Sequence, residues 1–521
     1  MGCVGHTSVH SDCGPRAWGS GVCARVVLNS SSSSQFTPLV FRMASTSQQI
    51  AAAVTAWARD NIGLHSALTI APGRYGLHVE TNAGIRAGTT LLAIPGDLLI
   101  TSNSARRASK LLGVSTAGVE LVHEEAHVAM AVWLMNATAH PEAAPRHAGW
   151  LAALPKAFDC TIEWSEAELA HLQASHARSR ANNLRRWADA EHGRLISKHA
   201  AASGSAWSQE RFRWALCAVW SRSFHLQQGS WRVLPPAADF FNHAVAPSVP
   251  SAHLEVMTDE ETSLDEIDDD ESTRVAAEAA VRAADAASAA DEARVAGDGR
   301  GITSAAAGGG ATATVRFVAI RDLGVAEHVE IDYGGRSNAE MLTTHGFAIY
   351  ANAHESLPLS LAPTAGDPLG AIKAKILAAG NLSVPFALSV GALHTDSDLL
   401  VALRILVSSA DELKHYSRAF RGEPVSERNE RRWRVVLRQH ADALLREREA
   451  QTTAEEDAAL LAALPLEQAS GRKAAALVTR LGEKRLLARV LAELEKMRSA
   501  VSLVEQSEAR VTERAGVVVP Q

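Results

Sequence analysis

Residues 234–243 read LPPAADFFNH, and this stretch carries the strongest local signal in the chain. Two prolines stiffen its start, and Asp239, Asn242 and His243 then lie close together beside two phenylalanines. Asp and Asn side chains often hold a turn by bonding to their own backbone, so the stretch is either an ordinary turn or the wall of a site. The spacing of its polar groups fits no common zinc pattern.

Two other segments combine glycine turns with strands. Residues 72–79 read PGRYGLHV, where glycine lets main chain approach a ligand closely, although an ordinary hairpin turn has the same pattern. Residues 329–340 read VEIDYGGRSNAE and are followed by HGF at 345–347. They predict a strand ending at Tyr333, a glycine turn, and a helix capped by Ser337 and Glu340. A tyrosine at this point is well placed to line a cleft.

The chain alternates between β and helical texture, which predicts an α+β fold. A β-rich core is split by a helical insertion and followed by an all-α C-terminal domain. Capping boxes open predicted helices at Ser165, Ser409 and Thr453. The predicted parts are an N-terminal segment (1–45), a first β part (46–101), the helical insertion (102–226), a second β part (227–355), the α domain (366–499) and a tail (500–521).

Composition excludes several protein classes. The 521 residues are 47% hydrophobic and 21% charged, close to the average for globular domains, and no apolar run is long enough to span a membrane. The net charge is -7, but residues 258–272 alone hold nine acidic side chains. Without that stretch the chain is near neutral, so we expect neither a nucleic-acid nor a membrane partner. The five cysteines form no CxxC pair, which argues against a cysteine-rich zinc cluster.

Two segments differ in composition from the rest. Residues 1–45 contain three arginines, one acid and an unbroken serine run, a composition typical of a transit peptide. A disordered tail, or a start at Met43, explains the same residues, so the expected location is the chloroplast stroma with the cytoplasm as alternative. Residues 258–312 are acidic, then alanine-rich, then glycine-rich. They are interpreted as a solvated spacer, with recruitment of a basic partner as the alternative.

Taken in order, the two glycine segments and the DFFNH segment between them resemble the SET-domain methyltransferases. They are most similar to the branch that contains the Rubisco large-subunit lysine methyltransferase and the actin-histidine methyltransferase. The similarity extends to WLAALP at 150–155, WSR at 220–222, FAL at 386–388 and LGEK at 481–484. It covers about residues 65–495 without the acidic insertion, and it implies a split SET domain followed by a helical substrate-binding domain.

The resemblance implies S-adenosylmethionine as cofactor and a set of site residues. Tyr333 corresponds to the tyrosine at the methyl-transfer channel, and the guanidinium of Arg222 would bind the cofactor carboxylate. The cofactor-binding residues implied are Gly73, Arg74, Tyr75, Arg222, Asp239, Phe240, Phe241, Asn242, His243, Ser337, Asn338 and Ala339. The substrate-binding residues implied are Phe224, Ala238, Leu254 and His345. No metal is needed, because the sulfonium already carries a good leaving group, and we expect no metal site and a monomer that binds its protein substrate through the helical domain.

The identity of the methyl acceptor is a separate question. His345 and the neighbourhood of Leu254 stand where Rubisco-methylating members carry pocket tyrosines. Phe224 and Ala238 stand where the actin-histidine enzyme carries an amide and a tryptophan. An aromatic wall without an amide donor favours the aliphatic amine of lysine over an imidazole. We therefore expect a lysine methyltransferase acting on a non-histone protein, a plastid protein such as the Rubisco large subunit being the natural candidate, with histidine methylation as the alternative.

Two further alternatives come from other functional classes. The first is a SET-like protein that binds a partner without catalysis, against which the retention of Arg222, Asn242, His243 and Tyr333 argues. The second is a zinc hydrolase, because residues 123–127 read HEEAH and two imidazoles four residues apart can share a helix face. The longer metalloprotease pattern fails after these residues, and among 21 histidines a chance match is unsurprising.

Overall fold

The computed structural model describes residues 37–102, 104–105, 126–198, 207–226, 231–257, 314–382, 384–394, 396–465, 468 and 471–514. The chain divides into two units, Met1–Ser47 and Gln48–Gln521. Of the predicted features, residues 1–36 of the N-terminal segment, the acidic insertion and the first histidine of the HEEAH pattern lie outside the described residues. Within the described residues, no helix combines the length and apolar character needed to cross a bilayer.

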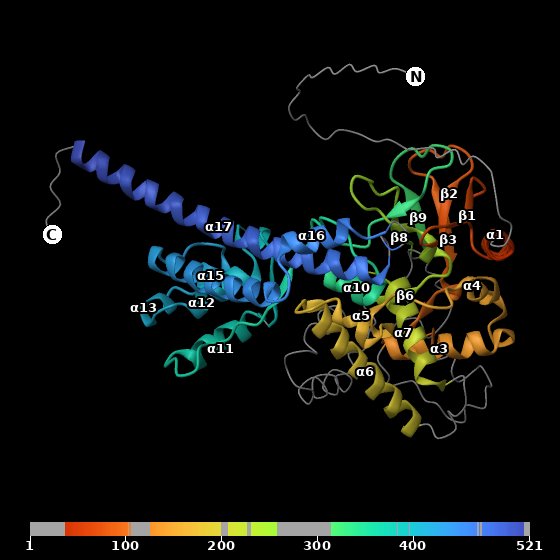
Figure 1. Ribbon diagram of the computed structural model, residues 1–521, viewed down its shortest axis with the longest axis horizontal. Helices are drawn as coiled ribbons and strands as arrows, with labels where there is room; N and C mark the ends of the chain where they lie inside the picture. Colours follow the sequence, from red (N-terminus) through yellow and green to blue (C-terminus); the bar gives the residue numbers. More distant parts are fainter. Residues whose placement is uncertain are drawn as a thin grey trace, which may run out of the picture. The chain divides into compact units, whose positions relative to one another are not determined.

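Small antiparallel sheets form the β-rich part, and they join segments from both sides of the helical insertion (Figure 1). A hairpin of β1 (Leu68–Gly73) and β2 (Gly76–Thr81) precedes β3 (Thr90–Pro95), which pairs with β9 (Thr314–Ala319), itself paired with β8 (Ala252–Met257). The other antiparallel sheet has the order β4 (Ile100–Thr101), β6 (Trp231–Leu234) and β5 (Phe224–Leu226). The predicted β core split by an insertion is confirmed, because strands far apart in sequence share these sheets.

The insertion is helical, as predicted. Its helices are α3 (Ala126–Ala139), α4 (Ala148–Ala153), α5 (Glu166–Ala170), α6 (His176–Lys198) and α7 (Gln209–Arg222), with short 3-10 turns at Pro141–Ala143, Pro145–His147 and Thr161–Glu163. Helix α3 is buried around its whole circumference from Val128 to Ala137 and packs against α7, as its uniformly apolar sequence requires. Ser165 and Glu168 form the predicted capping box of α5.

The N-terminal helix α1 (Thr37–Asn61) begins inside the segment 1–45 that was predicted to be disordered or transit-peptide-like. Ala51, Val54 and Ala58 of this helix, and Ile62 directly after it, are almost completely buried. Their spacing of three and four residues places them on one helical face. Val54, Ala58 and Ile62 pack in the same apolar core as β1 and β3, within the predicted first β part.

The C-terminal part is almost entirely helical. After α10 (Asn338–His345), a two-stranded ribbon of β11 (Leu357–Leu359) and β12 (Phe386–Leu388) accompanies the remaining helices. These are α11 (Gly370–Ala379), α12 (Asp398–Leu406), α13 (Ala410–Leu413), α14 (Ser417–Phe420), α15 (Glu427–Glu449), α16 (Ala454–Ala462) and α17 (Arg472–Arg514), with a 3-10 turn at Gly391–Leu393. The predicted capping boxes at Ser409 and Thr453 are present.

Helix α17 packs against α15 and α16 (Figure 1) and is longer than predicted. It continues to Arg514, through most of the segment 500–521 that was predicted as a tail. The sequence holds no glycine or proline between the end of the predicted domain and Gly516, so nothing local stops the helix.

Buried charged side chains stabilise the helical domain, and one of them, Glu483, also bonds to the insertion. The carboxylate of Glu483 on α17 is fully buried and accepts hydrogen bonds from the Ser175 hydroxyl (2.7 Å), the His176 main-chain N–H (3.0 Å) and Arg448 Nε (2.8 Å). Asp457 is equally buried and pairs with Arg480 and with Lys484 Nζ, the latter at 2.7 Å. Since these charges are removed from water, each depends on its partners, and the two regions are held in one arrangement.

Candidate active site

Two segments separated by about ninety residues pair with each other at the centre of the site. Strand β7 (Asn242–His243) pairs in parallel with β10 (Glu330–Ile331). The register is extended by the Ala244 N–H, which donates to the Ile331 carbonyl at 2.9 Å. The main-chain N–H of Tyr333 then donates to Nδ1 of His243 at 3.1 Å. The DFFNH segment and the tyrosine predicted from sequence therefore lie side by side.

Tyr333 is anchored at both ends. Its hydroxyl donates to the main-chain carbonyl of Phe241 at 2.9 Å, and its side chain is partly buried against the core. Burial raises the pKa of the phenol above its ordinary value, an effect that the positive charge of Arg222 opposes. The phenol therefore stays protonated at neutral pH and can only act as a hydrogen-bond donor or acceptor.

An aromatic cluster surrounds this tyrosine and is defined by His243, Tyr333, His345 and Phe347. The Tyr333 ring centroid lies 5.1 Å from that of His243, 5.4 Å from His345 and 6.5 Å from Phe347. Burial, with the positive charge of Arg336 next in size, lowers the pKa of His345 to about 3. Burial also lowers the pKa of His243. Both rings are uncharged at neutral pH, so the cluster carries no net charge.

Phe347 was not among the predicted site residues. It completes the cluster, with its ring 6.2 Å from His345 and 6.3 Å from His243. Gly346 brings it there, because this glycine has a φ of +81° and ends α10 in the left-handed conformation. The Gly-Phe pair directly after the predicted helix was the sequence feature that could have indicated Phe347 as a site residue.

Two of the four predicted substrate-binding residues, Phe224 and Leu254, lie beside a second aromatic group, centred on Phe317 of β9. The Phe317 ring stacks on Phe241 at 5.0 Å and meets Phe224 edge-on at 5.7 Å. Leu254 is its cross-strand partner. Of the other two predicted residues, His345 belongs to the cluster around Tyr333, and Ala238 is fully buried in the 3-10 turn Ala238–Phe240.

Arg222, at the end of α7, forms an ion pair with Asp239, whose side chain is fully buried. Asp239 also accepts a hydrogen bond from Trp150 Nε1 at 3.0 Å, so the tryptophan of the WLAALP stretch fixes the carboxylate. The Arg222 guanidinium lies over the ring of Phe158 at 5.5 Å. Its Nε is buried, and no described residue accepts a hydrogen bond from it. An anionic ligand group could satisfy that donor.

The glycine turn at residues 73–75 connects β1 and β2, and β2 contacts the 3-10 turn that carries Asp239. Gly73 is required by packing, since a Cβ there would lie 2.6 Å from Nδ1 of His78. Tyr75 is 76% exposed, with Arg74 over its ring at 5.5 Å. The turn therefore offers main chain and exposed side chains beside the DFFNH segment.

The predicted residues 337–339 are used by the fold itself. Ser337 and Glu340 form the capping box of α10. The Asn338 amide is fully buried and exchanges hydrogen bonds with the main chain of Ile349 at 2.7 and 3.0 Å. Ala339 is buried in a separate apolar cluster between α5, α6 and α17. Cofactor contacts by these three residues, as by the other predicted ligands, stay a prediction.

The HEEAH pattern gains no support from the histidine that the structure describes. Nδ1 of His127 accepts a hydrogen bond from Trp220 Nε1 at 2.9 Å. Trp220 lies two residues before Arg222 in the sequence, but it is buried in the core. This contact accounts for one of the two ring nitrogens of His127. His127 therefore has a structural role, because its hydrogen bond joins α3 to α7 where the two helices pack.

Comparisons with known proteins agree with this architecture. Residues 364–487 match the family described as Rubisco LSMT substrate-binding. The actin-histidine N-methyltransferase of Homo sapiens is 25% identical over 438 residues, covering 79% of this chain and 62% of that protein. The protein of the same name from Canis lupus familiaris is 36% identical over 186 residues, covering 33% of this chain and 30% of that protein. The chain thus spans less than two thirds of the length of these relatives.

Solved structures show the same fold. The SET domain of LSMT bound to lysine and AdoHcy aligns with a TM-score of 0.61 at 17% identity, covering 91% of this chain and 97% of that one. Rubisco LSMT bound to AdoMet aligns with a TM-score of 0.60 at 18% identity. The fold class and the branch predicted from sequence are confirmed, whereas the lysine acceptor is not, because the sequence relatives carry the name of histidine methyltransferases.

Proposed function

We propose that this chain, which has the SET fold of Rubisco LSMT and a Rubisco LSMT substrate-binding domain, is an S-adenosylmethionine-dependent protein N-methyltransferase. The observation that carries the proposal is the parallel pairing of β7 and β10. It brings Tyr333, His243 and the main chain of Phe241 into direct contact, with an uncharged aromatic cluster around them. A site of this kind suits transfer of a methyl group from a sulfonium to an uncharged nitrogen, without a metal or a covalent intermediate.

The residues around Arg222 fit the proposed cofactor. Its buried Nε finds no acceptor among the described residues, as expected where a ligand carboxylate supplies one. The ion pair with Asp239 holds the guanidinium in place, and the 72–79 hairpin and the DFFNH main chain lie next to it. S-adenosylmethionine supplies the electrophilic methyl group when bound. The protein residues hold the donor and the acceptor in line and exclude water.

We propose a histidine side chain of a protein as the acceptor. The curated relatives named actin-histidine N-methyltransferase support this choice. The chemistry also favours it, since an imidazole with a pKa of about 6.5 is mostly neutral at pH 7. The neutral rings of His345 and His243 offer nitrogen atoms near Tyr333, where an imidazole could be oriented.

Lysine remains the second candidate, and a specific observation favours it. Phe224, Ala238 and Leu254 offer an apolar wall without an amide to bond an imidazole. A lysine amine must first lose its proton, at a cost of roughly 4–5 kcal/mol near pH 7. An apolar channel beside a sulfonium lowers that cost by disfavouring a second positive charge.

A direct test incubates the purified full chain with radiolabelled S-adenosylmethionine and a protein extract, or with purified actin or Rubisco large subunit. Mass spectrometry of the labelled protein then identifies the methylated residue. Label on histidine supports the proposal, and label on lysine selects the second candidate. Cofactor binding without any methyl transfer would instead indicate a protein-binding module that has lost catalysis.

The location in the cell is a separate proposal, which rests on the composition of residues 1–45. Their serine run, three arginines and single acid suit plastid import. A fusion of these residues to a fluorescent protein, compared with a fusion that starts at Met43, tests this. Fluorescence in the plastid only with the longer fusion supports import, and a cytoplasmic signal from both contradicts it.

A further inference from the structure

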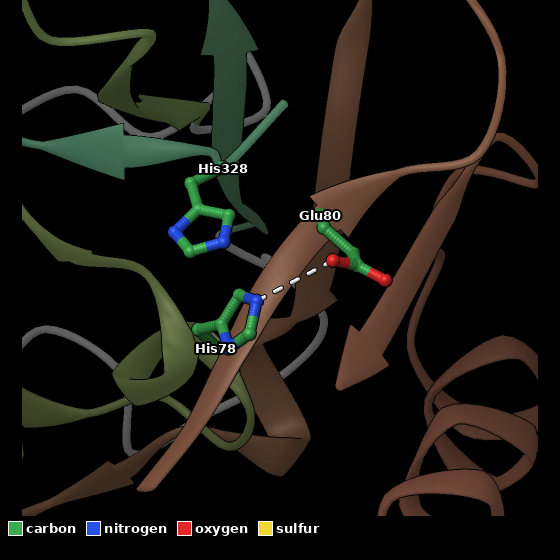
Figure 2. A group of neighbouring side chains, drawn as sticks. All are labelled: His78, Glu80 and His328. Carbon is green, nitrogen blue, oxygen red and sulfur yellow. Dashed lines mark ion pairs between the residues drawn. The ribbon is translucent and has the colours of Figure 1, made fainter. Parts of the chain in front are cut away.

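We propose that His78, Glu80 and His328 form a binding site for a divalent transition-metal ion, with Zn²⁺ as the best fit. The three side chains come from two segments about 250 residues apart in sequence, and Figure 2 shows their polar atoms turned toward one another. The ligand atoms all lie within 4.8 Å of one another. No local sequence pattern indicated this site, because the two histidines belong to no motif.

The backbone places these side chains together. His78 and Glu80 are two residues apart on β2, so they project from the same face of the strand. His328 forms an antiparallel bridge with Glu80, and the neighbouring Val329 N–H donates to the Val79 carbonyl at 2.9 Å. His328 is therefore the direct cross-strand partner of Glu80 and the diagonal partner of His78. Main-chain hydrogen bonds fix this arrangement without any metal.

His78 is the residue whose environment calls for a ligand. It is only 6% exposed, yet its Nε2 finds no hydrogen-bond partner among the described residues. Its ion-pair partner, an oxygen of Glu80, lies 3.5 Å away (Figure 2), beyond good hydrogen-bonding distance, and the rings of His78 and His328 are 4.1 Å apart. An unsatisfied buried nitrogen is costly, whereas a metal ion would accept its lone pair.

The donor set selects the class of ion. Two imidazoles and one carboxylate are ligands typical of zinc, with a fourth position left for water, whereas Mg²⁺ and Ca²⁺ prefer all-oxygen sites. Zinc bonds of about 2.1 Å place ligand atoms about 3.4 Å apart in a tetrahedral site. Glu80 is half-buried and His328 is exposed, so both can rotate to close the remaining distance around the buried His78.

Such an ion would fasten the β1–β2 hairpin to the segment that leads into β10. The ring of His78 packs directly against Gly73, at the turn proposed to contact the cofactor. Because the ion would bind the folded chain and not the unfolded one, it would raise the melting temperature. The inference does not depend on methyl transfer, and its test needs no activity.

The test titrates Zn²⁺ into the full chain, prepared without a histidine tag and stripped with a chelator, and follows binding by calorimetry. The variant His328→Ala removes an exposed ligand and should fold normally, unlike substitution of the buried His78. His253→Ala is the matched control, since His253 is also an exposed strand histidine, with Glu255 at 3.0 Å. Thermal unfolding with and without Zn²⁺ gives a second readout.

We expect wild type and His253→Ala to bind one more equivalent of zinc than His328→Ala, or to bind it at least tenfold more tightly. We also expect Zn²⁺ to raise the melting temperature of wild type and the control more than that of His328→Ala. An excess of Mg²⁺ should not compete. Equal zinc binding by wild type and His328→Ala would overturn the proposal. Cysteines and other histidines would then explain the zinc that is bound.

Discussion

The hydroxyl of Tyr333 donates a hydrogen bond of 2.9 Å to the main-chain carbonyl of Phe241, next to the parallel pair of β7 and β10. This bond joins the two segments that the sequence singled out. It fixes the phenol at the edge of the aromatic cluster, where the tyrosine can orient an acceptor nitrogen. The ring is held independently by its contacts with His243 and His345, so the hydroxyl can be removed without losing the packing.

Substitution Tyr333→Phe tests the role of that hydroxyl. We expect kcat for methyl transfer to fall about a hundredfold, the usual effect of removing one positioned hydrogen-bonding group, with cofactor affinity unchanged. The loss of one hydrogen bond should lower the free energy of unfolding by only about 1 kcal/mol. Steady-state kinetics and calorimetry with the cofactor measure both. Tyr350→Phe, at a tyrosine that is 59% exposed, is the control, and equal activity of the two variants would contradict the assignment.

The Arg222–Asp239 pair provides a second prediction. Asp239→Asn keeps an acceptor for Trp150 Nε1 but leaves the Arg222 cation without its buried partner, so the free energy of unfolding should fall by about 3–5 kcal/mol. The control Asp189→Asn breaks the pair with Arg213, whose side chains are 35% and 22% exposed, and should cost less than about 1 kcal/mol. Urea unfolding measures both. Similar losses of unfolding free energy in the two variants would show that the buried Arg222–Asp239 pair stabilises the fold no more than an exposed pair does.

Local signals in the sequence predicted the elements well. The capping boxes at Ser165, Ser337, Ser409 and Thr453 depend on residues three positions apart, and all four open helices. Strands near Gly76, Trp231 and Thr314 were predicted because β-branched or apolar runs are bounded by turn residues. Convergence of Arg222, His243 and Tyr333 rested on the resemblance, since no local pattern relates them.

Contacts between distant segments could not be predicted. Phe317 lies in a strand whose pattern shows only that it faces inward, and its stacking on Phe241 depends on the strand order. Glu483 is an ordinary acidic helix residue in the sequence, but the fold buries it against Ser175 and Arg448. Burial of charge and cross-segment pairing follow from tertiary structure, so periodicity and composition carry no trace of them.

Glu355 makes the stability of the protein depend on pH. Burial, followed by repulsion from Glu483, raises its pKa from 4.5 to about 8. Between these two values the folded chain binds a proton that the unfolded chain has lost, so stability should fall as the pH rises from about 4.5 to about 8. The group's contribution amounts to a few kcal/mol, at most about 1.4 kcal/mol per pH unit.

Glu355→Gln should remove this contribution. The amide is neutral at every pH and can still accept the Asn338 main-chain N–H, which donates to Glu355 at 3.2 Å in wild type. We therefore expect the variant to match wild type near pH 5 and to be more stable by a few kcal/mol at pH 8. Urea unfolding of both proteins at the two pH values measures this. Parallel pH profiles would show that Glu355 is ionised in the folded protein.

The pH dependence of kcat/KM separates the two acceptors, because only the neutral nitrogen can attack the methyl group. A histidine with a pKa of about 6.5 is largely neutral above pH 7, so its rate should level off there. A lysine with a pKa of about 10.4 gives a rate that rises about tenfold per pH unit up to pH 9. The groups of the aromatic cluster should not obscure this range.

His345 titrates at about 3, the pKa of His243 is lowered, and the pKa of Tyr333 is raised, so burial has moved all three away from pH 7–9. We expect a plateau between pH 7 and pH 9, in line with a histidine acceptor. Initial rates with one protein substrate and saturating cofactor measure the profile, and mass spectrometry at both ends checks that the methylated residue is the same. A continuous tenfold rise per unit to pH 9 would instead establish that a strongly basic amine attacks, since no group in the aromatic cluster gives up a proton in that range.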